Sequence, residues 1–117
     1  MTREEAIKNH RKMWNWIADQ YENGSKNDII AVKRQYLETM NINPYPSQLC
    51  FLCQFCIDNF SGCEMCPVIW KNFECSNSEY GRIYELTEKL FFSRKKAAKI
   101  ARIIANLPER SYRSDKK

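Results

Sequence analysis

The sequence is poor in glycine, proline and histidine, and it contains no long apolar run. Three glycines and four prolines among 117 residues leave few sharp turns, and no glycine-rich phosphate-binding loop is present. The single histidine, His10, forms no nucleophile–histidine pairing that the sequence can support. No segment approaches the roughly 18 consecutive apolar residues that a membrane span needs. We therefore expect neither an enzyme nor a protein with a membrane partner.

The amino terminus lacks the apolar core of a signal peptide, because residues 1–8 are charged from the start. We therefore expect a cytoplasmic protein, in a compartment where thiols stay reduced and cysteine clusters usually bind metal. With 44% apolar and 28% charged residues, the composition is that of one folded domain.

The chain is rich in one residue type, since six cysteines lie between positions 50 and 75. Two Cys-x2-Cys pairs bring four thiolates to one point, the tetrahedral arrangement that structural zinc prefers. We therefore predict a zinc site with the ligands Cys50, Cys53, Cys63 and Cys66. Cys56 and Cys75 are surplus, and the sequence leaves open whether either replaces one of the four. A disulfide scaffold and inert buried thiols are the alternatives to a metal.

An iron–sulfur cluster is the alternative cofactor. Cys50-x2-Cys53-x2-Cys56 and a distal cysteine followed by proline repeat the ligand pattern of bacterial ferredoxins. The distal cysteine stands further away than in ferredoxins, however, and Cys63 would have no role. Zinc is therefore the preferred prediction. His10 precedes the cluster by about 40 residues and is expected as a surface residue rather than a ligand.

Apolar periodicity predicts a mostly α fold of about four helices, with the Cys-rich zinc-binding loop between the second and third. The first helix is expected over 2–22 with a capping box of Thr2 and Glu5, and the second from a cap at Ser25 or Asn27 to about Met40. These two should form an antiparallel hairpin. A third helix is predicted from Ser76 or Ser78 to about Phe92, with Leu90 and Phe91 facing inward, and a fourth over 94–106. We expect a single domain over 1–108 with its zinc-binding insert at 49–76. A flexible basic tail is predicted over 109–117.

Charge and exposed aromatics suggest two partner surfaces. Residues 77–117 carry eleven basic and five acidic side chains, a net charge of +6. Lys95, Lys96, Lys99 and Arg102 lie off the apolar face of the last helix, where they would suit a phosphate backbone or an acidic protein surface. A solvated helix face is the simpler interpretation. Trp16 lies roughly 200° around its helix from the preceding aromatic, so it is either an interface anchor or packs on the Cys-rich loop.

Three patches, residues 5–18, 63–70 and 101–110, together resemble the small cytosolic proteins of bacteriophages and prophages of Gram-positive bacteria that carry a Cys-x2-Cys…Cys-x2-Cys-Pro-x2-Trp cluster. The similarity spans nearly the whole chain. Residues that match the family pattern are Cys50, Cys53, Cys63, Cys66, Cys75 and Trp70, whereas Cys56 lies outside it. The resemblance implies a phage origin, a bacterial host cytoplasm and a metal site, but no activity.

Small accessory phage proteins often act on host machinery. We therefore predict a small zinc-binding protein that binds a host protein, as an inhibitor of host defence or of other host machinery. A zinc-dependent nucleic-acid-binding module that uses the basic carboxyl-terminal helix is the alternative. An iron–sulfur redox protein is the third hypothesis.

Overall fold

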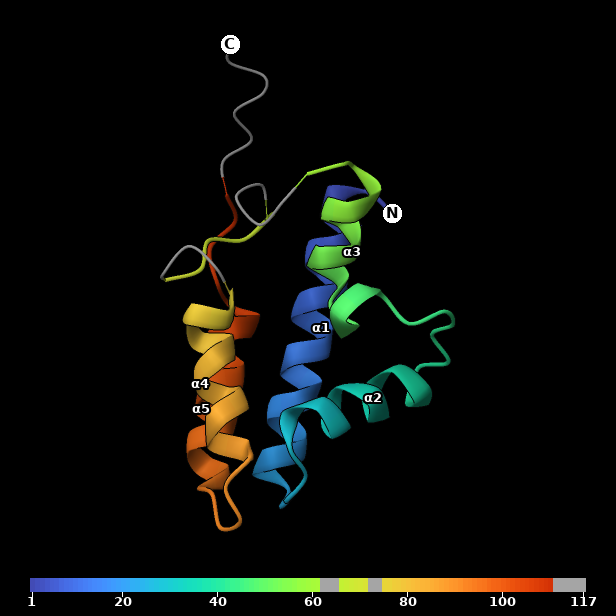
Figure 1. The fold of residues 1–117 in the computed structure, drawn as a ribbon. Helices are drawn as coiled ribbons and strands as arrows, with labels where there is room; N and C mark the ends of the chain where they lie inside the picture. Colours follow the sequence, from blue (N-terminus) through green and yellow to red (C-terminus); the bar gives the residue numbers. More distant parts are fainter. Residues whose placement is uncertain (62–65, 72–74, 111–117) are drawn as a thin grey trace.

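The computed structural model describes residues 1–61, 66–71 and 75–110. Its α-helices are α1 (Arg3–Glu22), α2 (Ile29–Thr39), α3 (Phe51–Asp58), α4 (Glu79–Thr87) and α5 (Arg94–Ala105), with the 3-10 helices η1 (Ser47–Leu49) and η3 (Cys75–Asn77) (Figure 1). The prediction of a mostly α fold is confirmed. Within the described residues, no helix combines the length and the apolar character needed to cross a membrane.

The first helix forms where its sequence predicts. The Thr2 hydroxyl accepts a hydrogen bond from the Glu5 amide at 3.0 Å, and the Glu5 carboxylate accepts one from the Thr2 amide at 2.7 Å, which completes the capping box. Gly24, with a φ of 103°, takes the backbone out of the helix in a conformation that other residues rarely adopt. The buried face of α1 consists of Ala6, Ile7, His10, Met13, Trp14, Ile17, Ala18 and Tyr21.

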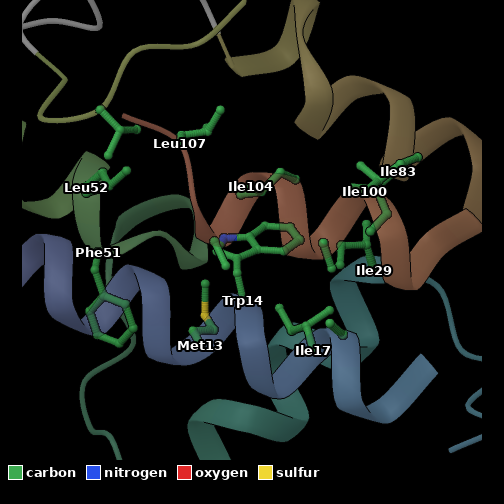
Figure 2. Packing of buried hydrophobic residues seen from close by; sticks show 14 of the residues in the cluster. Met13, Trp14, Ile17, Ile29, Phe51, Leu52, Ile83, Ile100, Ile104 and Leu107 are labelled. Atoms are coloured by element: carbon green, nitrogen blue, oxygen red, sulfur yellow. The ribbon is translucent and has the colours of Figure 1, made fainter. Parts of the chain in front are cut away.

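The last helix is the main packing partner of α1. The Ser93 hydroxyl caps α5 by accepting a hydrogen bond from the Lys96 amide at 3.2 Å. Four alanines and two isoleucines form its buried face: Ala97, Ala98, Ile100, Ala101, Ile104 and Ala105. Figure 2 shows Met13, Trp14 and Ile17 of α1 packed toward Ile100 and Ile104 of α5.

The second helix differs from the prediction in its cap and its direction. Asp28, and neither Ser25 nor Asn27, caps α2, because its carboxylate accepts a hydrogen bond from the Ala31 amide at 2.9 Å. The Ile29 amide donates to the Thr87 hydroxyl of α4 at 3.0 Å in a buried contact. This tertiary bond fixes where α2 begins, and α2 crosses the end of α1 instead of forming an antiparallel hairpin with it (Figure 1).

The third predicted helix is shorter than its apolar residues suggested. It corresponds to α4 and ends at Thr87, and Leu90 and Phe91 in the following turn are 86% and 92% exposed instead of facing inward. The chain must reverse between residues 88 and 93 so that α5 can pack back along α4 and α1. Phe92 anchors this turn by an edge-to-face contact with Tyr21, with ring centroids 5.7 Å apart.

The Cys-rich segment contains a helix where the sequence predicted a loop. Phe51, Leu52 and Cys56 form the buried face of α3, which packs against α1. The helix was missed because its eight residues are too few for a sustained apolar stripe. The predicted insert is therefore partly helical, and the described residues form five α-helices instead of about four.

The start of the predicted tail belongs to the folded domain. Val68 and Glu109 form an antiparallel bridge, flanked by hydrogen bonds from the Ile69 amide to the Pro108 carbonyl at 2.9 Å and from the Arg110 amide to the Pro67 carbonyl at 2.7 Å. Residues 111–117 of the predicted tail lie outside the described residues.

Candidate metal centre

Two cysteines stand at the amino-terminal end of α3. Cys50 is the N-cap residue and Cys53 lies in the first turn. A hydrogen bond between the two thiols lowers the pKa of Cys50 to about 6 and raises the pKa of Cys53. Cys50 is the acidic member because Lys33 and backbone amides of α3 also stabilise its thiolate.

The backbone before Cys50 is held in an uncommon conformation. Gln48 and Leu49 have φ values of 57° and 54°, in the left-handed region that residues with a Cβ seldom occupy. Two such residues in succession cost on the order of 1–3 kcal/mol each, and such strain is concentrated at functional sites. They turn the chain so that Cys50 caps α3.

Cys66 is held from two sides. The Trp70 indole N–H donates to the Cys66 sulfur at 3.4 Å, and the Arg110 guanidinium donates to the Cys66 carbonyl at 2.8 Å. Arg3 of α1 donates to the carbonyls of Pro67 and Arg110. Burial raises the pKa of the Cys66 thiol. Both ends of the described fold therefore help to position this cysteine.

Cys75 begins η3, which lies tightly against the first turn of α4. A Cβ atom at Gly81 would overlap the carbonyl oxygen of Ser76, so this position requires glycine for the close approach. The glycine therefore fixes the distance between α4 and the turn that carries Cys75.

These cysteines meet around two neighbouring cavities. The first, about 220 Å³, is lined by Cys50, Cys53, Cys56, Cys66 and Cys75, together with Trp70. The second, about 260 Å³, shares Cys50, Cys53, Cys75 and Trp70 and extends to Lys33 and His10. Each of the five cysteines in the described segments is a thiol.

Three of the four predicted ligands thus line one cavity, and the fourth, Cys63, lies outside the described residues. Cys75, which the sequence left as surplus, lines the cavity with them. Across residues 1–61, 66–71 and 75–110, however, no three histidine, cysteine or carboxylate side chains are close enough together to hold a metal ion.

A buried lysine faces these cysteines, and sequence reasoning missed it. Lys33 of α2 is only 2% exposed. Its ammonium donates hydrogen bonds to the Gln48 carbonyl and to the Tyr80 hydroxyl, both at 3.4 Å. The ammonium also lies 4.6 Å from the centroid of the Tyr80 ring. Burial lowers the pKa of Lys33, while Cys50, Cys53 and Cys75 act in the opposite direction. The available signal was its place on the apolar stripe of α2, four residues after Ile29.

This lysine provides a test of whether the residues suit a metal. A buried ammonium is strongly disfavoured without an anionic neighbour, and the ionisable groups nearest to Lys33 include three thiols. Ionised thiols, as in a metal-thiolate centre, would supply the missing negative charge. The donor type of these side chains therefore fits zinc.

His10 is buried, and the expectation of a surface histidine is wrong. It is 1% exposed, and its Nε2 lies 3.0 Å from the Ile104 carbonyl, to which it donates. Ile104 stands in the last turn of α5, and the residue four positions later is Pro108, which has no amide hydrogen to offer. Nδ1 has no hydrogen-bond partner within the described part of the chain. Burial lowers the pKa of His10 to about 4.

The structure divides the residues proposed as partner surfaces. Trp16 is half-buried against the core and packs edge-to-face on Tyr36 of α2, with ring centroids 5.4 Å apart. Arg102 pairs with Asp19 at 2.5 Å and with Glu22 at 3.0 Å on α1. Of the cationic side chains predicted for the partner surface, Lys95, Lys96 and Lys99 are exposed, and Arg94 at the start of α5 is exposed beside them.

Comparison with known proteins gives no further information on the site: no protein-family model matches the chain, and no curated protein or solved structure shows significant similarity to it.

Proposed function

We propose that this chain is a small zinc-binding protein of phage type that binds a host protein, as an inhibitor of host defence or of other host machinery. The phage origin and the host partner come from the family resemblance. Support for zinc comes from the thiols gathered around one cavity. The observation that favours a protein partner is the exposed pair Leu90 and Phe91.

The zinc would act as a structural clip. Cys50 and Cys53 come from the start of α3, whereas Cys66 follows the α3 helix and stands beside Trp70. The fourth ligand is Cys63 or Cys75. A structural zinc with four protein ligands has no open coordination position for catalysis, and zinc has a filled d shell. Purified protein should therefore be colourless and contain zinc by elemental analysis, whereas a brown sample containing iron would support the iron–sulfur alternative.

The proposed docking surface consists of the turn between α4 and α5, with Leu90 and Phe91, and of the start of α5, with Lys95, Lys96 and Lys99. It lies at one end of the molecule, away from the Cys-rich segment (Figure 1). In the described structure, none of these lysines forms an ion pair with a carboxylate. Two exposed apolar side chains beside unpaired lysines complement an acidic protein surface with an apolar slot.

The test is capture of a partner from bacterial lysate with three forms of the protein. Leu90→Ser with Phe91→Ser should lose 2 kcal/mol or more of binding free energy, roughly 30-fold in affinity. Phe60→Ser is the matched control, because Phe60 is a 98% exposed aromatic at the Cys-rich end. Equal affinity for wild type and the double variant would place the interface elsewhere.

Nucleic-acid binding is the second candidate, favoured by the three exposed lysines of α5. Each phosphate contact releases counterions, so affinity for a nucleic acid would fall steeply with salt concentration. Binding to a protein through an apolar pair would depend less on salt. Repeating the capture at two salt concentrations, with and without nuclease, therefore separates the two functions.

A further inference from the structure

The buried lysine on α2 is the least explained charge in the fold. The Lys33 ammonium lies beside the Trp14 and Tyr80 rings, 5.9 Å and 4.6 Å from their centroids. Its hydrogen-bond acceptors are the Gln48 carbonyl and the Tyr80 hydroxyl, both neutral. Within the described residues it has no carboxylate within salt-bridge distance.

Such an arrangement is costly unless something compensates the charge. Removing an ammonium from water strongly disfavours the folded state. Cation–π contacts with two rings offset only part of this cost. The buried Lys33 therefore implies that an anion lies nearby in the functional protein.

The groups that face Lys33 identify that anion. They come from every element around the 260 Å³ cavity: His10 and Trp14 from α1, Gln48 from η1, Cys50 and Cys53 from the start of α3, Cys75 from η3 and Tyr80 from α4. His10 is a neutral base here, and the Tyr80 phenol is neutral at physiological pH. The cysteines are the remaining candidates, and they become anionic when they bind metal.

We propose that Lys33 is the internal counter-ion of the cysteine metal centre, a positioning residue that strengthens metal binding by offsetting the negative charge of the thiolates. This inference rests on the proposed zinc site. A zinc ion bound by four thiolates carries a net negative charge, and such a charge inside a protein is stabilised by a fixed cation close to it. Because the pair is buried, added salt should weaken this effect little.

Loss of the Lys33 charge should affect the metal-free and the zinc-loaded protein to different degrees. Lys33→Met keeps the length of the side chain and removes its charge. Zinc affinity, measured by competition with a chromophoric chelator, should fall about 10- to 100-fold, the usual effect of losing a group that supports metal ligands. Metal-free Lys33→Met, unfolded with urea in the presence of chelator, should lose less stability than the zinc-loaded variant, because the metal-free thiols carry less negative charge for Lys33 to offset. A merely structural lysine would lower the stability of both forms equally.

Lys26→Met is the matched control, since Lys26 is exposed in the turn before α2 and its loss changes the net charge equally. Its zinc affinity should stay within about threefold of wild type, a change of less than 1 kcal/mol. If Lys33→Met does not fold, Lys33→Gln replaces it in the same comparison. Wild-type zinc affinity in the neutral variant would overturn the role of Lys33 alone, whereas a wild type that binds no zinc would overturn the metal site and this inference together.

Discussion

The α1–α5 pair and the Cys-rich segment, residues 41–77 in their described parts, are stabilised in different ways. Interdigitated alanines and isoleucines join α1 to α5, and Ile17 and Ile104 are fully buried. The described parts of the Cys-rich segment instead contain an eight-residue helix, four non-glycine residues with positive φ, and polar contacts to both ends of the described fold. Apolar burial accounts for the stability of the helix pair. The Cys-rich segment is instead of the kind that a bound metal ion stabilises.

The largest expected effect comes from removing the thiols of the first ligand pair. Cys50→Ser and Cys53→Ser should each abolish zinc retention, because structural zinc contributes on the order of 10 kcal/mol in small domains. Amide hydrogen exchange should then accelerate in α3 and η3 and change little in α1 and α5. Elemental analysis together with exchange mass spectrometry measures both effects.

Cys56→Ser is the control for this experiment, because Cys56 belongs to the buried apolar face of α3. It should retain zinc. The pair Cys63→Ser and Cys75→Ser then identifies the fourth ligand, since only one of them should lose the metal. Uniform acceleration of exchange over α1 and α5 as well would contradict the separation of the two regions.

The same contrast explains how far the sequence predicted the structure. Boundaries of α1 and α5 could be predicted within one or two residues, because each has a side-chain cap and a sustained apolar stripe. The start of α2 could not, since the Thr87 hydroxyl, 58 positions away in the chain, takes the Ile29 amide. The exposure of Leu90 and Phe91 also depends on where α5 packs, which apolar periodicity does not encode.

The candidate site was predicted by residue type more than by position. The spacing of the cysteines identified the thiols but did not show that Cys75 lines the same cavity as Cys50, because the tight packing of Gly81 against Ser76 brings it there. Lys33 and His10 were missed because each is a polar residue on an otherwise apolar face. Such residues are the ones for which a single sequence gives the weakest guidance.

The second prediction tests the one buried histidine between the α1 and α5 helices. Burial lowers the pKa of His10 from 6.5 to about 4, so the unfolded chain takes up a proton in this interval and the folded protein does not. The stabilisation is therefore complete above pH 6.5 and is lost as the pH falls toward 4, by about 3 kcal/mol in total. Urea unfolding of wild type and His10→Gln at several pH values between these limits should show a steeper loss for wild type. Parallel curves would contradict the burial of His10, and the comparison cancels any contribution from cysteine protonation.

The smallest expected effect concerns Arg102, which the sequence placed on the docking surface and the structure places on the α1–α5 pair. Its guanidinium donates to Asp19, Glu22 and the Asn15 side chain, the last at 3.0 Å, and it is about one-third exposed. Partly exposed ion pairs contribute about 0.2–1 kcal/mol each, and salt screens them. Arg102→Gln should therefore lower the free energy of unfolding by about 1 kcal/mol at low salt and by less at high salt. Lys99→Gln is the control, because Lys99 lies on the same helix but has no ion pair in the described structure. It should change the free energy of unfolding by only a few tenths of a kcal/mol.

Partner capture provides the decisive readout for Arg102. Because its charge is already neutralised by two carboxylates of α1, Arg102→Gln should capture the partner as wild type does, whereas Lys95→Glu with Lys96→Glu should weaken capture and slow association. Circular dichroism of each variant provides the folding control. An equal loss of capture for Arg102→Gln and the lysine pair would return Arg102 to the docking surface and extend that surface from the α4–α5 turn along α5 to the α1–α5 contact.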